Sequence, residues 1–447
     1  MASIKAPKKL KNGQLSFQIV VYLGRDPSGK AIVESENYIA YSKAPTKAQK
    51  EAEAFACEFE RKVLAGEIGD GDKITFTDFV EIWKKNWLVS KTPNVRENYV
   101  KILNRVAIPR IGMMKLAAIR PAHIDMILND RKAEGKAAAT VRKDFTPINS
   151  VFKYAVKKQY IRDNPCDRRD DLPTVKAKGG NDIMFFTEDQ ARRFLKDALT
   201  MTYKYTCKEH KRTLKSTGET YTVPAYTEEH TVPLQWRVYF TLSIYGMFRR
   251  GEICALTWAD LDMKKHIVSI TKSVSRTKET GQFVKEPKTA AGVRDLVLPA
   301  DCFVLLSKLK MEQLELMSKL GSSWKGHRNG KKEDGTMDSF DDNAIFIQPE
   351  NGLPIDISTP GHKFREILNY YNGTCEKEED KLPLIRLHDL RHTGATLLLA
   401  SNVDIETVSR RLGHSKASVT LDVYGHALPE NDKKAADLLG NMFHGCI

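Results

Sequence analysis

Hydrophobic and polar residues alternate in the first part of the chain. Residues 15–23 alternate in the manner of a strand, and residues 31–41 form a second stretch of this kind. Between them, residues 24–30 contain Asp-Pro and Ser-Gly pairs, which are typical of a turn. Residues 46–66 are rich in Ala and Glu and end at a glycine, as helices often do. We therefore expect residues 1–70 to form a small α+β module.

Helical periodicity dominates the next part of the chain. From residue 75 to the Asn-Pro pair at 164–165, apolar residues recur at helical spacing, and short breaks with Pro or Gly separate the segments. This pattern predicts four or five amphipathic helices. Residues 75–172 should therefore form an all-α domain. Its stretch 91–158 is strongly basic, with 15 Lys and Arg against 5 Asp and Glu.

The third part of the chain, residues 183–447, mixes both kinds of pattern. It begins with a capping box at Thr187 and Gln190, which predicts the start of a helix. Residues 266–274 and 295–299 are strand-like. We therefore predict a multidomain chain whose last domain is mixed and mainly α-helical, with a small antiparallel sheet.

Two segments of this third domain are expected to be insertions, and its end carries a tail. Residues 202–232 resemble a hairpin with a Ser-Thr-Gly turn, and residues 321–343 are rich in Gly, Lys and Asp. Residues 430–447 predict a short helix with one apolar face, which is too small to fold alone and must dock on its own domain or on another subunit. That face is formed by Ala435, Ala436, Leu438, Leu439 and Met442.

Residues 385–426 predict short helices whose ends carry polar side chains. Asp404 is suited to be an N-cap, and Gly413 is suited to end the helix that lies between them. A further short helix should begin a few residues later and carry Tyr424. The helix ends in this stretch therefore bring polar groups close together.

Four of these polar side chains suit phosphoryl transfer without a metal ion. His388 and Arg391 lie three positions apart, so they project from one face of a helix, and His414 and Tyr424 follow. Phosphoryl transfer needs cations and hydrogen-bond donors around the phosphate oxygens, and a nucleophile. The alternative is a helical hairpin with surface charges, in which His414 caps a helix and Tyr424 belongs to the core.

The order of these residues resembles the C-terminal signature of the tyrosine recombinases, also called phage-type integrases. The chain reads HDLRHT, then LGH, then a tyrosine ten residues on and a histidine two residues beyond it. The resemblance implies an arginine and a lysine upstream, and both are present.

The upstream arginine and lysine match the family at Arg249 and Lys288. Residues 244–262 resemble the family's Gly-Leu-Arg-x-x-Glu box, although Met247 stands where the family usually has glycine, and Arg250 is an adjacent alternative. The family's lysine lies on a β-hairpin, in a Lys-Thr pair before an arginine, and Lys288 fits that description. Other lysines of the region stay open as alternatives: Lys272, Lys278 and Lys285.

The resemblance implies site-specific cutting and rejoining of DNA strands, without a cofactor or a metal ion. Tyr424 would attack the scissile phosphate and form a 3′-phosphotyrosine link. His388 would accept the tyrosine proton, because a phenol with a pKa near 10 needs help at neutral pH, and Lys288 would protonate the leaving 5′ oxygen. The other members would bind the phosphate oxygens: Arg249, Arg391 and His414.

The resemblance also implies double-stranded DNA as the partner of all three domains. Residues 1–70 would bind arm-type sites and residues 75–172 core-type sites, while residues 183–447 would be the catalytic domain of a subunit that forms a tetramer on DNA. A host DNA-bending protein and an excision factor are further partners of this kind of enzyme. The side chains expected on DNA are Lys8, Lys9, Lys153, Lys157 and Lys158.

Composition agrees with a nucleic-acid partner. The formal net charge is +14 and the pI is about 9.2, so a polyanion is expected. The seven cysteines are scattered without a CxxC pair, which favours reduced thiols in a cytoplasm. We find no signal-peptide pattern, no apolar run of membrane-spanning length and no P-loop motif. We therefore expect a bacterial cytoplasmic protein that is nucleoid-associated when bound to DNA.

The predicted function is integration and excision of a mobile element, because the N-terminal module and the insertions favour an integrase of a phage or conjugative transposon. One alternative is a type IB topoisomerase, which shares the chemistry but relaxes DNA without exchanging partners. The other is a DNA-binding regulator that does not cut DNA.

Overall fold

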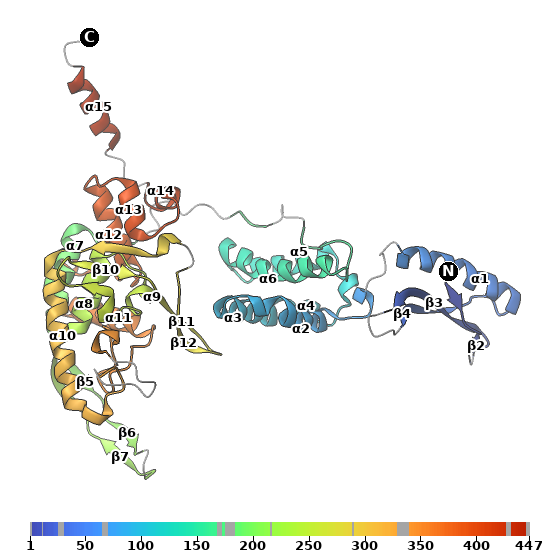
Figure 1. Ribbon diagram of the computed structural model, residues 1–447, viewed down its shortest axis with the longest axis horizontal. Coiled ribbons are helices and arrows are strands. Elements are labelled where there is room, and N and C mark those ends of the chain that lie inside the picture. Colours follow the sequence, from blue (N-terminus) through green and yellow to red (C-terminus); the bar gives the residue numbers. More distant parts are fainter. Residues whose placement is uncertain are drawn as a thin grey trace. The chain divides into compact units, whose positions relative to one another are not determined.

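The computed structural model divides into two compact units, residues 1–175 and residues 176–447 (Figure 1). We call them the N-terminal unit and the C-terminal unit. The structure describes the chain over the ranges 2–10, 12–25, 31–64, 70–167, 172–174, 184–214, 217–287, 290–328, 339–425 and 431–443.

The N-terminal unit begins with an antiparallel sheet and one helix. The elements are β1 (Ser3–Ile4), β2 (Lys8–Lys9), β3 (Leu15–Arg25), β4 (Ala31–Ile39) and α1 (Pro45–Leu64). Strand β3 pairs with the other three strands. Alternate residues of β3, namely Phe17, Ile19 and Val21, are buried because they pack against an alanine-rich face of α1. The predicted α+β pattern is confirmed.

A helical bundle follows in the same unit. Its helices are α2 (Phe76–Asn86), α3 (Pro93–Ile102), α4 (Ile108–Ile111), α5 (Pro121–Ala133) and α6 (Ala138–Lys157), and a π-helical turn (Leu103–Ala107) joins α3 to α4. The predicted helical pattern is therefore confirmed. Phe76 and Phe79 of α2 and Phe152 of α6 are fully buried in the bundle. Next to this core, the guanidinium of Arg131 donates to the buried carboxylate of Asp144 at 2.9 Å.

The C-terminal unit is built around helix α8 (Leu234–Tyr245). Most residues of this helix are apolar and buried, as expected for the centre of a helical domain. Its neighbours include α10, α11 and α12. The other α-helices described in this unit are α7 (Glu188–Arg193), α9 (Arg250–Ile253), α10 (Ala300–Leu320), α11 (Thr359–Thr374), α12 (Asp389–Ala400), α13 (Ile405–Leu412), α14 (Ala417–Tyr424) and α15 (Asn431–Met442).

Small antiparallel sheets complete this unit. Strands β9 (Leu261–Asp262), β10 (Ile267–Ile270) and β13 (Arg294–Val297) form one sheet, and β11 (Ser273–Thr277) pairs with β12 (Gly281–Lys285) in a hairpin. The predicted mainly α-helical domain with a small antiparallel sheet is therefore confirmed. A turn at Ala290–Gly292 leads directly into β13.

The two predicted insertions are described to different extents. The first is a long hairpin, in which β5 (Thr202–Cys207) pairs with β8 (Tyr226–Thr231) and β6 (His210–Thr213) pairs with β7 (Thr220–Val223). Much of the second lies outside the described residues.

The boundary between the predicted first and second domains stays a prediction, although the sheet module and the bundle have separate cores. Over the described ranges, no helix is long and apolar enough to cross a membrane.

Candidate active site

The buried arginine Arg391, in the first turn of α12, is the centre of the candidate site. Its side chain donates to the carbonyl oxygen of Met247 at 2.5 Å and to that of Leu412 at 2.6 Å. Burial, together with the nearby cation of Arg249, lowers the pKa of Arg391 to about 9. The guanidinium therefore remains charged at neutral pH, and it joins the turn after α8 to the end of α13.

Met247 makes this turn with an uncommon backbone conformation. Its φ is +50°, in the left-handed region that glycine enters at little cost. Its side chain is fully buried. Glycine adopts such a backbone conformation at little cost, which is a physical reason for the usual glycine in the Gly-Leu-Arg-x-x-Glu box. In this chain a buried methionine adopts the conformation instead.

Arg249 lies next to this turn, at the N-cap of α9. Its Nη1 donates to the Glu252 carboxylate at 2.8 Å, and its Nη2 reaches the carbonyl oxygen of Gly413 at 3.3 Å. Its side chain remains 42% exposed, so part of the guanidinium is open to solvent. Through these contacts, the structure places Arg249 beside the segment that leads into His414.

His414 follows a helix end that was predicted from local sequence. Asp404 caps α13 by accepting from the backbone N–H of Thr407, and Gly413 ends the helix with φ +64°. His414 Nε2 lies 3.2 Å from Arg391 Nη2, and its Nδ1 lies 2.9 Å from Thr420 Oγ1. Arginine can only donate, so Nε2 accepts from Arg391 and Nδ1–H donates to Thr420.

Tyr424 ends α14, and its hydroxyl is buried in the same group of residues. Only 1% of its surface is exposed, and its Oη lies 2.6 Å from Nδ1 of His392. Burial raises the pKa of Tyr424 to about 12 and lowers the pKa of His392 to about 4, the latter with help from His388. At neutral pH the phenol is therefore protonated and donates its hydrogen bond to a neutral imidazole.

His392 is a member of the group that our sequence analysis missed. His388 was predicted to accept the tyrosine proton, but the hydrogen bond to Tyr424 in the structure is made by His392. The two imidazole rings meet edge to face, with centroids 5.0 Å apart. The signal was present in the sequence, because His392 lies four positions after His388 and therefore on the same helix face.

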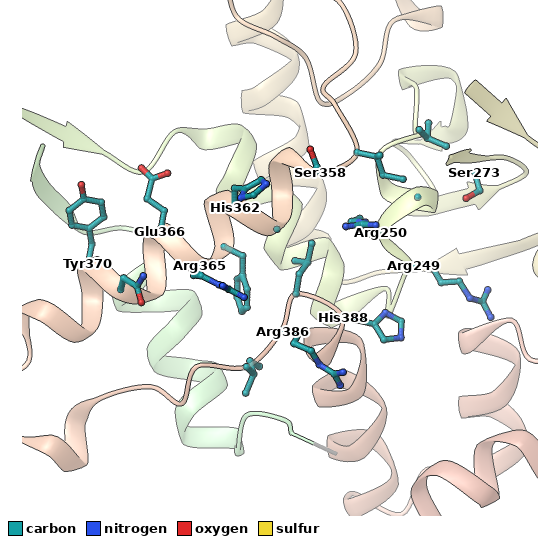
Figure 2. A pocket seen from close by; sticks show the side chains of 18 residues that line it. Arg249, Arg250, Ser273, Ser358, His362, Arg365, Glu366, Tyr370, Arg386 and His388 are labelled. Atoms are coloured by element: carbon teal, nitrogen blue, oxygen red, sulfur yellow. The ribbon is translucent and has the colours of Figure 1, made fainter. Parts of the chain in front are cut away.

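A large cleft begins beside Arg249 and His388 and runs along α11 (Figure 2). Arg249 and His388 line one end, and Tyr370 lies at the other end. The polar side chains between these ends are Arg250, His362, Arg365, Glu366 and Arg386. Arg250 thus lines the cleft, whereas Arg249 also contacts the segment that carries His414.

Lys288 lies outside the described residues. The described chain ends at residue 287 on one side and resumes at 290 on the other. Among the alternatives, Lys272 forms an ion pair with Asp260 at 3.0 Å and donates to the hydroxyl of Thr257. Lys272 is therefore held within the fold, and Lys288 stays the prediction.

The lysines predicted to contact DNA all lie at the surface of the N-terminal unit. Lys8 and Lys9 form the short strand β2 and are exposed. Lys153, Lys157 and Lys158 are exposed on and just after α6. The exposure of these five side chains is compatible with DNA contact, which stays a prediction.

Within the described ranges, no group of three or more His, Cys, Asp or Glu is arranged to hold a metal ion.

Two models of one protein family match this chain. The model described as phage integrase central domain matches residues 76–171, and the model described as phage integrase family matches residues 306–431. The first match falls on the helical bundle. The second includes the segment that carries Arg391, His414 and Tyr424.

Similar proteins span nearly the whole chain. The tyrosine recombinase XerC-like protein of Caldanaerobacter subterraneus subsp. tengcongensis is 25% identical over 98% of this chain and 99% of its own. The ICEBs1 integrase of Bacillus subtilis is 25% identical over 97% of this chain and 99% of its own. A solved structure of the Tn1549 transposon integrase with transposon right end DNA has a similar fold, with a TM-score of 0.60 and 18% identity over 82% of this chain and 100% of that chain.

The neutral histidines predict that acid destabilises the C-terminal unit. His392 and His414 have pKa values of about 4 in the folded unit, against about 6.5 in an unfolded chain. Between these values the unfolded chain binds more protons, so the free energy of unfolding falls as the pH is lowered from about 6.5 towards 4. Thermal unfolding at several pH values measures the fall. The variants His392→Gln and His414→Gln should each show a smaller fall, and an unchanged fall in both would contradict the assignment.

Proposed function

This chain belongs to the phage integrase family of tyrosine recombinases, and we propose that it is a site-specific DNA recombinase whose nucleophile is Tyr424. The observation that carries the proposed roles is that hydrogen bonds hold distant segments together around Arg391, whose helix also carries the partner of the Tyr424 hydroxyl. Arg249, Arg391 and His414 come from three segments that hydrogen bonds hold together. His392 then joins Tyr424 to the same helix as Arg391.

Two arginines would hold the non-bridging oxygens of the scissile phosphate. Arg391 is fixed by two carbonyl groups, so it need not reorganise as charge develops in the transition state. Arg249 has part of its guanidinium open to solvent, where a phosphate can reach its planar set of donors. Together they would supply the cationic clamp that metal-free phosphoryl transfer needs.

His414 would add a hydrogen bond to the phosphate after gaining a proton. In the DNA-free protein its Nε2 accepts from Arg391, and burial together with the cation of Arg391 lowers its pKa to about 4. A phosphate at this place adds negative charge, which favours the protonated imidazole. The imidazolium could then donate to the phosphate.

In the reaction, the Tyr424 oxygen would bond to phosphorus as the bond to the 5′ oxygen breaks. The tyrosine proton leaves at the same time, and Lys288 would give a proton to the 5′ oxygen. His388 is the acceptor that the family resemblance implies, and His392 is the acceptor that is already bonded to the phenol. The energy of the broken bond is kept in the 3′-phosphotyrosine, so a second DNA end can reverse the step without ATP.

Double-stranded DNA is the proposed partner of both units. The basic stretch 91–158 gives the N-terminal unit a surface for phosphates, and a cleft lined by arginines adjoins the candidate site in the C-terminal unit. Relatives of this chain include the integrase of ICEBs1 and, at 22% identity over 76% of this chain, the transposase from transposon Tn916 of Enterococcus faecalis. We therefore propose that the DNA sites belong to a mobile element of this general kind, read through arm-type and core-type sites.

We further propose that the protein works in a bacterial cytoplasm, bound to the nucleoid while it acts, and that it assembles into a tetramer on DNA. The exposed apolar residues of the C-terminal helix support assembly. Leu438, Leu439 and Met442 of α15 are each more than half exposed, so this face is not covered in the monomer. A host DNA-bending protein and an excision factor stay predictions.

Tyr424→Phe should abolish the covalent protein–DNA adduct on a nicked duplex while leaving DNA affinity nearly unchanged. The phenyl ring keeps its packing, and only the nucleophilic oxygen and its bond to His392 are lost. Gel analysis of denatured reaction mixtures measures the adduct. Adduct formation by the purified variant would show that Tyr424 is not the nucleophile.

Two outcomes with the wild-type protein would favour the alternative functions. DNA binding without an adduct would favour a regulator, and relaxation of DNA without exchange between two duplexes would favour a topoisomerase.

Lys288→Ala should be severely slowed on ordinary DNA and restored by a substrate with sulfur in place of the bridging 5′ oxygen. A thiolate leaves without protonation, so the general acid becomes dispensable. Single-turnover cleavage of the two substrates measures the effect. If Lys288→Ala remains equally slow with sulfur, another residue is the acid.

Removal of the chain after Pro429 should leave binding to a single half-site intact but abolish cooperative synapsis and recombination. The reason is that α15 would dock on a neighbouring subunit through its exposed apolar face. Gel-shift assays with one half-site and with paired sites separate the two activities. Loss of half-site binding together with the thermal transition of the C-terminal unit would show instead that the tail belongs to its own core.

A further inference from the structure

The buried arginine Arg294, at the start of β13, makes a set of contacts that no proposed catalytic role accounts for. Its side chain is 7% exposed, and that of its partner Glu252 is 4% exposed. Arg294 Nη2 donates to Glu252 at 2.9 Å, and Nη1 donates to the other carboxylate oxygen at 3.3 Å. An ion pair that is this deeply buried requires well-placed hydrogen bonds to offset the cost of desolvation.

The remaining donors of Arg294 reach two other segments. Its Nε donates to the carbonyl oxygen of Arg411 at 2.9 Å, near the end of α13, and its Nη1 donates to the carbonyl oxygen of Gly292 at 3.0 Å. A Cβ atom at Gly413 would lie only 2.9 Å from Nη1 of Arg294. The guanidinium is therefore packed tightly against the chain just before His414.

Each segment that Arg294 contacts lies next to a proposed functional residue. Glu252 also accepts from Arg249, Gly292 ends the turn that follows Lys288, and Arg411 lies three positions before His414. We propose, on the basis of the recombinase function above, that Arg294 is a positioning residue that fixes these three segments relative to one another. Its hydrogen bonds go to Glu252, Gly292 and Arg411, so it would act through the neighbouring functional residues and not on the phosphate itself.

Charge gives Arg294 a second effect on Arg249. The Glu252 carboxylate lies between two guanidinium groups. Burial raises the pKa of Glu252, but the hydrogen bond and charge of Arg294, together with the backbone N–H and charge of Arg249, outweigh it and lower the pKa. With Arg294 present, the trio of two arginines and one carboxylate keeps a net positive charge. Without Arg294, the carboxylate would pair with Arg249 alone and cancel more of the charge that Arg249 offers to a phosphate.

Lysine cannot replace arginine in this arrangement. A guanidinium carries donors in a planar fork, so it can bind both oxygens of Glu252 and, through Nε, a carbonyl group on another segment. An ammonium group keeps the charge but is a single point that cannot span these acceptors. The variant Arg294→Lys therefore tests geometry, and Arg294→Gln tests geometry together with charge.

The test is single-turnover formation of the covalent adduct on a nicked duplex at saturating DNA. The rate constant of the exponential reports on folded molecules alone, so a partly unfolded preparation lowers the amplitude and not the rate. We expect Arg294→Lys and Arg294→Gln to slow the step on the order of 100-fold, since small misplacements of catalytic groups have effects of this size. DNA affinity, measured by titration, should change little.

The control variant Arg192→Gln removes an exposed ion pair of α7, with 70% and 77% of the two side chains exposed, and should react like the wild type. The sulfur-containing substrate should restore at most part of the rate of the Arg294 variants. Arg294 contacts Glu252, which binds Arg249, and the chain just before His414, and neither Arg249 nor His414 is the proposed general acid.

Wild-type rate constants in both Arg294 variants would overturn the inference, as would full restoration by sulfur. If wild type and Arg192→Gln form the adduct and Tyr424→Phe does not, the proposed function stands whatever the Arg294 variants do.

Discussion

The buried guanidinium of Arg391 is the interaction on which the candidate site depends. It binds carbonyl groups of Met247 and Leu412, which lie 144 and 21 residues away in sequence. A cation in this position needs its acceptors, because leaving a buried charge unpaired costs several kcal/mol. The turn after α8 and the end of α13 are therefore held where the guanidinium requires them, and His414 is placed as a result.

Local sequence signals allowed much of the fold to be predicted. The Asp404 cap, the Gly413 helix end and the Thr187 capping box each involve groups within a few residues, so their chemistry is visible in the sequence. The same holds for the alternating pattern of β3 and the helical period of the bundle. The resemblance to tyrosine recombinases supplied the order of the candidate residues, and the structure brings Arg249, Arg391, His414 and Tyr424 together.

Contacts between distant segments could not be predicted in this way. His392 and Tyr424 are 32 residues apart, and Glu252 and Arg294 are 42 residues apart, so neither pair leaves a periodic or local signal. The packing of α12 and α14 against α13 decides which histidine meets the tyrosine. The packing of α9 against β11 and of β13 against α13 decides which arginine meets the carboxylate. The buried methionine at position 247 is a further example, since its left-handed backbone follows from the turn and not from the residue type.

The position of Tyr424 at the end of α14 sets a geometric limit on assembly. Helix α15 begins at Asn431, seven residues further on. Even a fully extended chain of that length spans only about 25 Å. The first turn of α15 must therefore lie within this radius of the nucleophile's backbone, on whichever subunit the helix docks. The length of this short stretch of chain thus limits how far from its own catalytic tyrosine the helix can begin.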